Sequence, residues 1–102
     1  MGEKTIFEQA VDAWGPVSQA GMVNEEAGEL ITVLNQWIRG RAKADRVAEE
    51  VADMAIMLDQ IKFIMQAGGV DPQEFDRQVI RFRDLKLARL HKLLKQEAKA
   101  HE

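Results

Sequence analysis

The stretch VNEEAGELITVLNQW, residues 23–37, places carboxylates on the same side of a helix as its apolar residues. At about 100° per residue, Leu30 and Trp37 fall on one face of the helix, and Glu26 falls among the apolar residues of that face. Glu29 lies at the edge of the same stripe. Because a buried carboxylate is costly without a partner, this segment predicts a helix whose inner face carries a polar site.

A second stretch, VAEEVADMAIMLDQI at residues 47–61, repeats the pattern. Glu50 falls beside Met57 in an apolar stripe, and Asp53 lies at the edge of that stripe. The two carboxylate pairs are symmetric in the sequence about the RGR segment between the stretches. A hairpin that turns at RGR therefore brings all four carboxylates to one level.

The chain has 102 residues, no cysteine and a formal net charge of −3. This length fits one domain, residues 1–102, and excludes a separate cofactor domain. The lack of cysteine excludes disulfides and thiolate metal sites. The acidic net charge argues against a nucleic-acid polymer as partner. Because we find neither a membrane-spanning stretch nor a signal-peptide apolar region, we expect a cytoplasmic protein with no membrane partner.

Helix-forming residues dominate the chain, and no sustained alternation of polar and apolar residues predicts a strand. We expect an all-α fold: a four-helix bundle-like subunit with an antiparallel central helix pair, assembling into a homo-oligomer. Gly15-Pro16, Gly40 and Gly68-Gly69 divide the four helices. The expected helices begin after Thr5, cover residues 16–39 and 44–67, and begin again at Pro72, with a tail that frays from about residue 96.

Capping residues mark the first and last helices. Thr5 with Glu8, and Asp71 with Glu74, have the spacing of capping boxes. The spacing of apolar residues predicts that the first helix buries Phe7, Ala10, Val11 and Trp14.

The third helix is apolar nearly all round, because Ile56 and Phe63 lie opposite the stripe that contains Glu50. Such a helix is expected to be buried on two sides. We expect the second side to be a subunit interface.

Four ionised carboxylates in one helix interface need a positive charge between them. The alternative is a solvated face, or pairing with basic residues of the last helix. An oxygen-only set of ligands favours Mg²⁺ or Mn²⁺. A di-iron centre would require E-x-x-H, and neither central helix contains a histidine.

The segments EEAGE at residues 25–29 and EVAD at residues 50–53 resemble the E-E-x-x-E … E-x-x-D signature of the MazG-like nucleotide pyrophosphohydrolases, in the all-α NTP pyrophosphatase superfamily. The similarity covers about residues 7–90 and includes AVDAWG and the RGR turn. It implies a homodimer or a dimer of dimers that hydrolyses a nucleoside triphosphate to the monophosphate and pyrophosphate. It also implies that Mg²⁺ is bound by Glu26, Glu29, Glu50 and Asp53.

Further residues are assigned by their place on the helices. Glu25, Glu26 and Glu50 are the candidate catalytic residues. Glu25, on the solvent side of Glu26, is placed to orient water, with an ordinary exposed glutamate as the equal alternative. The candidates for phosphate binding are Arg81, Lys86 and Arg89.

Base recognition needs a flat apolar surface and a hydrogen-bonding group. Trp14 and Trp37 are the candidates for stacking, and core packing is the alternative for each. Gln19 shares the face of the carboxylates and is the candidate to bond a base edge.

Two other functions remain open. A related enzyme with a dedicated substrate, such as phosphoribosyl-ATP, would carry the same carboxylates. A non-catalytic helical interaction module would use the apolar face of the last helix to bind a partner helix.

Overall fold

The structure is a computed structural model that describes residues 4–101. Throughout this range the regular elements are helices, which confirms the all-α prediction. The elements are α1 (Ile6–Trp14), α2 (Pro16–Ile38), α3 (Ala44–Ala67) and α4 (Pro72–Ala100). The chain divides into two units, the first ending at Val70 and the second beginning at Asp71. Among the helices of the described range, none is both long enough and apolar enough to cross a bilayer.

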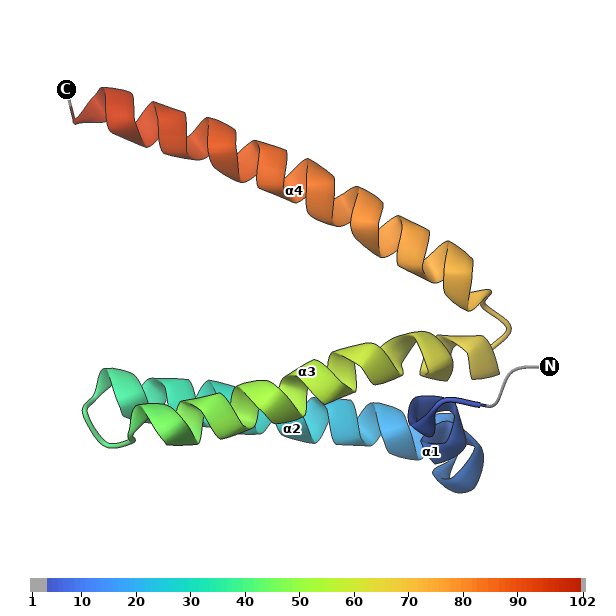
Figure 1. Cartoon of the computed structure of the whole chain (residues 1–102). Helices are drawn as coiled ribbons and strands as arrows, with labels where there is room; N and C mark the ends of the chain where they lie inside the picture. The colour runs from blue at the N-terminus through green and yellow to red at the C-terminus, as the bar shows by residue number, and fades with distance from the viewer. Residues whose placement is uncertain (1–3, 102) are drawn as a thin grey trace. The chain divides into compact units, whose positions relative to one another are not determined.

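Helices α2 and α3 form an antiparallel hairpin, and Figure 1 shows them side by side. The turn contains Gly40 at φ 73°, a backbone conformation that glycine adopts without a steric penalty. The amide of Arg41 donates to the carbonyl of Gln36 at 2.7 Å, which closes the end of α2. The central helix pair and its turn are therefore confirmed.

Helix α1 lies across the open end of the hairpin, away from the Gly40 turn (Figure 1). The rings of Phe7 and Phe63 stack with centroids 6.3 Å apart and planes at 11°. Val11 of α1 is buried as well. The expectation that Phe63 faces a subunit interface is therefore wrong, because α1 of the same chain covers that ring.

The prediction that α1 buries all four of its apolar positions is only partly right. Val11 is buried and Phe7 and Ala10 are half-buried, but the side chain of Trp14 is 67% exposed. Trp14 is the last residue of α1, and Gly15 at φ 87° turns the chain directly after it. No further turn of α1 follows to cover the indole.

The two predicted capping boxes differ. Thr5 accepts from the amide of Glu8 at 3.2 Å, and Glu8 accepts from the amide of Thr5 at 3.4 Å, so this box is complete. Asp71 accepts from the amide of Glu74 at 3.1 Å, as predicted. The carboxylate of Glu74 bonds instead to Arg77, at 2.6 Å from Nη2, and this second box is half formed.

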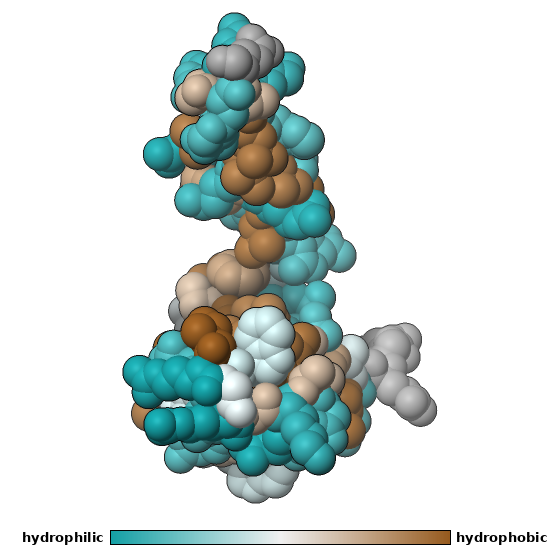
Figure 2. Space-filling view, turned by 90° about the vertical axis from the view of Figure 1, so that its left-hand side faces the viewer, coloured by the Kyte–Doolittle hydropathy of each residue, from teal (hydrophilic) through white to brown (hydrophobic). Residues whose placement is uncertain are grey.

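Helix α4 is continuous to Ala100, where the sequence predicted fraying from about residue 96. The tail KQEAKA contains no glycine or proline, and the His101 ring lies 2.6 Å from Glu97 Oε1. Figure 2 shows a hydrophobic band along this helix, bordered by hydrophilic side chains. The band includes the exposed residues Val79, Ile80, Phe82, Leu85, Leu87, Leu90, Leu93 and Leu94.

Candidate functional site

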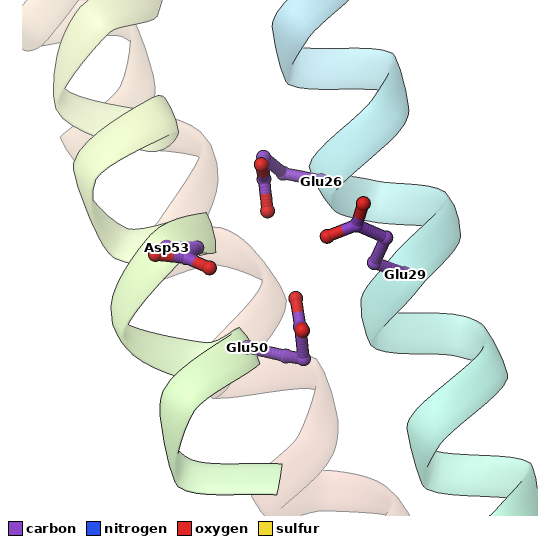
Figure 3. A group of neighbouring side chains, drawn as sticks. All are labelled: Glu26, Glu29, Glu50 and Asp53. Carbon is purple, nitrogen blue, oxygen red and sulfur yellow. The ribbon is translucent and has the colours of Figure 1, made fainter. Parts of the chain in front are cut away.

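Four carboxylates converge between α2 and α3. Figure 3 shows Glu26 and Glu29 extending from α2 toward Glu50 and Asp53 of α3. One carboxylate oxygen from each residue can be chosen so that all four atoms lie within 4.8 Å of one another. The prediction that the hairpin brings these side chains to one level is therefore confirmed.

Two oxygens of this acidic cluster are buried without a protein partner. Glu50 is only 9% exposed, and Glu26 is half-buried. Within the described residues, Oε2 of Glu26 and Oε2 of Glu50 accept no hydrogen bond. A buried acceptor that has lost water and gained no donor destabilises the fold. The cluster therefore has capacity for a positively charged ligand.

The electrostatics of the cluster point the same way. Burial raises the pKa of Glu26, and the neighbouring charges of Glu29 and Asp53 raise it further. Burial is also the first cause of the raised pKa of Glu50, followed by the charge of Glu29. Glu26 and Glu50 thus resist ionisation because they are buried and their neighbours are acids, and a cation beside them would oppose this effect.

The cluster has the chemistry and size of a site for a hard divalent ion. Its ligands are all carboxylate oxygens, the donors that Mg²⁺ and Mn²⁺ prefer. Opposite ligands of an octahedral Mg²⁺ ion lie about 4.2 Å apart, since each bond is about 2.1 Å long. Oxygens within 4.8 Å of one another need only small side-chain movements to reach that geometry.

A cavity of about 740 Å³ lies beside the acidic cluster, between α1, the start of α2 and α3. Met22 and Met57 line it, and they stand about one turn along their helices from Glu26 and Asp53. The remaining lining residues are Ile6, Phe7, Gln9, Ala10, Ala13, Trp14, Ser18, Gln19, Ile56 and Gln60. The cavity is mostly apolar, as small-molecule sites usually are.

Two buried amides line this cavity. Gln60 Nε2 donates to Gln19 Oε1 at 2.5 Å, and the two residues are 2% and 5% exposed. Gln19 is the residue predicted from the sequence to bond a base edge, whereas Gln60 was not predicted. A signal was present, because Gln19 precedes Glu26 by seven residues and Gln60 follows Asp53 by seven.

The candidates for base binding are separated by the structure. Trp14 and Gln19 line the cavity, whereas Trp37 is 52% exposed and lies outside its lining. Glu25 is exposed beside the acidic cluster on α2, and the cluster itself consists of the other four acids.

The candidates for phosphate binding all lie on α4 and are exposed: Arg81, Lys86 and Arg89. Arg81 donates to Gln78 Oε1 at 3.3 Å, and its guanidinium lies 5.4 Å from the ring centroid of Phe82. Their role in phosphate binding stays a prediction.

Comparison of the chain with protein-family models, with curated proteins and with solved structures gives no match. A functional assignment therefore depends on the geometry of the acidic cluster and its cavity, together with the signature in the sequence.

Proposed function

We propose that the protein is a Mg²⁺-dependent nucleoside triphosphate pyrophosphohydrolase, which hydrolyses a ribo- or deoxynucleoside triphosphate to the monophosphate and pyrophosphate. The observation that carries this proposal is the acidic cluster, two of whose buried oxygens have no hydrogen-bond partner in the described part of the chain. The similarity of EEAGE and EVAD to the MazG-like signature supports the same reaction. A role in clearing unwanted nucleotides from the cell fits this reaction.

Glu26, Glu29, Glu50 and Asp53 would hold Mg²⁺ or Mn²⁺. Such an ion neutralises phosphate oxygens and lowers the pKa of water, which is the chemistry that phosphoanhydride hydrolysis requires. The hairpin itself fixes the positions of the four carboxylates, because each projects from a continuous helix. Glu25, exposed on α2 next to Glu26, would orient a water molecule. Arg81, Lys86 and Arg89 of α4 stay the candidates for binding phosphate groups.

The cavity is the proposed site of the base. Its apolar lining, with Trp14 at the edge, would cover the faces of a base and exclude water. Since the cavity is lined by residues one helical turn from Glu26 and Asp53, a base bound there places its sugar and phosphates toward the acidic cluster.

We further propose that the chain works as a homodimer or a dimer of dimers. The buried hydrophobic residues of the described range are few, namely Val11, Val33 and Phe63. On the hairpin, Leu34, Trp37 and Ile38 are exposed close to one another along α2. Contiguous exposed apolar residues of this kind mark an interface, which sedimentation at micromolar protein would reveal as a species larger than the monomer.

The reaction is tested by product analysis. Purified protein is incubated with each nucleoside triphosphate in the presence of Mg²⁺, and the products are separated by chromatography. We expect monophosphate and pyrophosphate, with no activity in a chelator. Diphosphate and orthophosphate as primary products would contradict the proposal. A comparison of the standard nucleotides with phosphoribosyl-ATP distinguishes general from dedicated hydrolysis.

A helical interaction module is the second candidate, and the hydrophobic band of α4 favours it (Figure 2). An amphipathic helix with an exposed apolar face is the usual ligand of a hydrophobic groove. Protein that shows no hydrolysis of any triphosphate, but retains Mg²⁺ binding, would favour this function over the enzyme.

A further inference from the structure

The hydrogen bond between Gln19 and Gln60 leaves other polar atoms of the two amides available to a ligand. Its one mutual bond, from Gln60 Nε2 to Gln19 Oε1, occupies one donor and one acceptor. This bond does not use the oxygen of Gln60 or the nitrogen of Gln19, so the pair can offer an acceptor and a donor to a ligand. Both residues line the cavity.

This pair can present its donor and acceptor in either order. The oxygen and nitrogen of an amide occupy almost equivalent positions, so a half-turn of each side chain exchanges them without moving the backbone. If both amides turn together, Gln19 donates to Gln60 and their mutual bond is kept. The position offered by Gln19 then changes from donor to acceptor, and the position offered by Gln60 changes from acceptor to donor.

The amide pair also has a fixed relation to the acidic cluster. Gln19 lies seven residues before Glu26 on α2, and Gln60 lies seven residues after Asp53 on α3. Seven residues of α-helix span about 10.5 Å. Met22 and Met57 line the cavity between the two levels. A base edge at the amides would thus leave room for its sugar along the methionines and for its phosphates at the carboxylates.

We propose that the Gln19–Gln60 pair binds the hydrogen-bonding edge of the base and accepts both amino and keto bases by turning over. This inference rests on the proposed function. Cytosine presents an amine donor beside a ring acceptor, and uracil presents a carbonyl acceptor beside a ring donor. The two bases have the same size but the opposite order of groups. A site whose donor and acceptor cannot exchange positions would select one of the two bases, whereas the amide pair can form hydrogen bonds with both.

Binding of non-hydrolysable analogues tests this without relying on turnover. The α,β-imido analogues of dCTP and dUTP are titrated into the protein by calorimetry with Mg²⁺ present. We expect the two dissociation constants to agree within about tenfold, which corresponds to a difference of less than about 1.4 kcal/mol. A larger preference for either base, or no binding of either analogue, overturns the inference.

Gln60→Glu removes the ability to turn over. As a carboxylate at mildly alkaline pH, residue 60 only accepts, so Gln19 must donate to it and both positions facing the base become acceptors. Each base can then make only one of its two bonds. Cytosine donates its amine but brings its ring nitrogen toward an oxygen, and uracil donates its ring N–H but brings its carbonyl toward an oxygen. We expect both analogues to bind about tenfold or more weakly. The matched control is Gln36→Glu, an exposed amide of α2 outside the cavity, which should keep both wild-type affinities.

A double variant keeps the test decisive if Gln60→Glu does not fold. Gln19→Met with Gln60→Met removes both polar partners together, which leaves no unpaired amide. It should weaken binding of both analogues by a similar factor of about ten or more. Wild-type affinity in this variant, or wild-type affinity for either analogue in folded Gln60→Glu, overturns the inference. Analogue binding with the expected affinities but no hydrolysis of natural triphosphates would contradict the proposed function alone.

Discussion

Glu50 of the hairpin and Glu74 of α4 are both glutamates, but their surroundings shift their pKa values in opposite directions. Glu74 accepts from Gln78 at 2.9 Å and from Arg77 at 2.6 Å, and these bonds lower its pKa. Glu50 is buried among acids, one of its oxygens has no hydrogen-bond partner within residues 4–101, and its pKa is raised. The fold supplies cationic and amide donors where a carboxylate serves the helix surface. At the acidic cluster, the described residues place no such donor against the buried oxygen of Glu50. A cation-binding site would have this property.

The largest difference between these two glutamates is expected in turnover. Glu50→Gln removes a ligand charge with almost no change of shape, so pyrophosphate release should fall by about a hundredfold or more. Glu74→Gln changes only the surface of α4 and should retain wild-type turnover. Both variants are assayed by pyrophosphate release after circular dichroism has shown that each is folded. Equal activity of the two would remove the functional distinction between the sites.

Metal binding should give the next largest effect. Because Mg²⁺ or Mn²⁺ would bind the folded cluster and not the unfolded chain, adding it should raise the melting temperature. At a concentration one hundred times the dissociation constant, the stabilisation is about 2.7 kcal/mol. Glu26→Gln should reduce this shift, whereas Glu74→Gln should leave it unchanged. Differential scanning fluorimetry measures all three, and an absent shift in the wild type at millimolar ion would speak against a metal site.

Without metal, the same two substitutions should change stability in opposite directions. Glu50→Gln removes a charge that burial and its acidic neighbours disfavour, so the melting temperature in a chelator should rise. Glu74→Gln weakens the bonds to Arg77 and Gln78 and should lower the melting temperature slightly. A destabilised, chelator-treated Glu50→Gln protein would mean that the carboxylate stabilises the fold through a contact other than those of the cluster.

The sequence was sufficient for the parts of this molecule that depend on local chemistry. Gly15, Gly40 and the cap at Asp71 fix where helices begin and end, because their backbone roles hold in any context. The symmetric spacing of the acids about the turn was sufficient to predict that they converge. In an antiparallel helical hairpin, the position of the turn determines which residues of the two helices lie at the same level.

What the sequence missed depends on contacts between distant segments. Phe63 is covered by α1 because Phe7 stacks on it, and periodicity within α3 carries no information about which neighbour covers a face. Gln60 reads as an ordinary surface amide until the hairpin register places it against Gln19. The partners of Glu74 were missed for a related reason, because a capping box and a bond to Arg77 compete for the same carboxylate.

The smallest effect, and the most specific, is expected in the pH dependence of stability. An acid with a raised pKa binds its proton more tightly in the folded state, so without metal the contribution of Glu50 to stability falls as pH rises from its ordinary value of 4.5 through the raised pKa. Glu74 has a lowered pKa, and its contribution is lost as pH falls below 4.5 through the lowered value.

The two glutamates thus act in separate pH windows, and each variant isolates one of them. In a chelator, the melting temperature of Glu50→Gln minus that of the wild type should grow as pH rises above 4.5. The melting temperature of Glu74→Gln should be lower than that of the wild type above pH 4.5, and this difference should disappear as pH falls below 4.5. With Mg²⁺ present, the melting-temperature difference between Glu50→Gln and the wild type above pH 4.5 should change sign. The reason is that the metal requires ionised carboxylates and binds the wild type more tightly as pH rises. Difference curves that stay flat with pH would show that Glu50 and Glu74 are not opposed in the way their partners indicate.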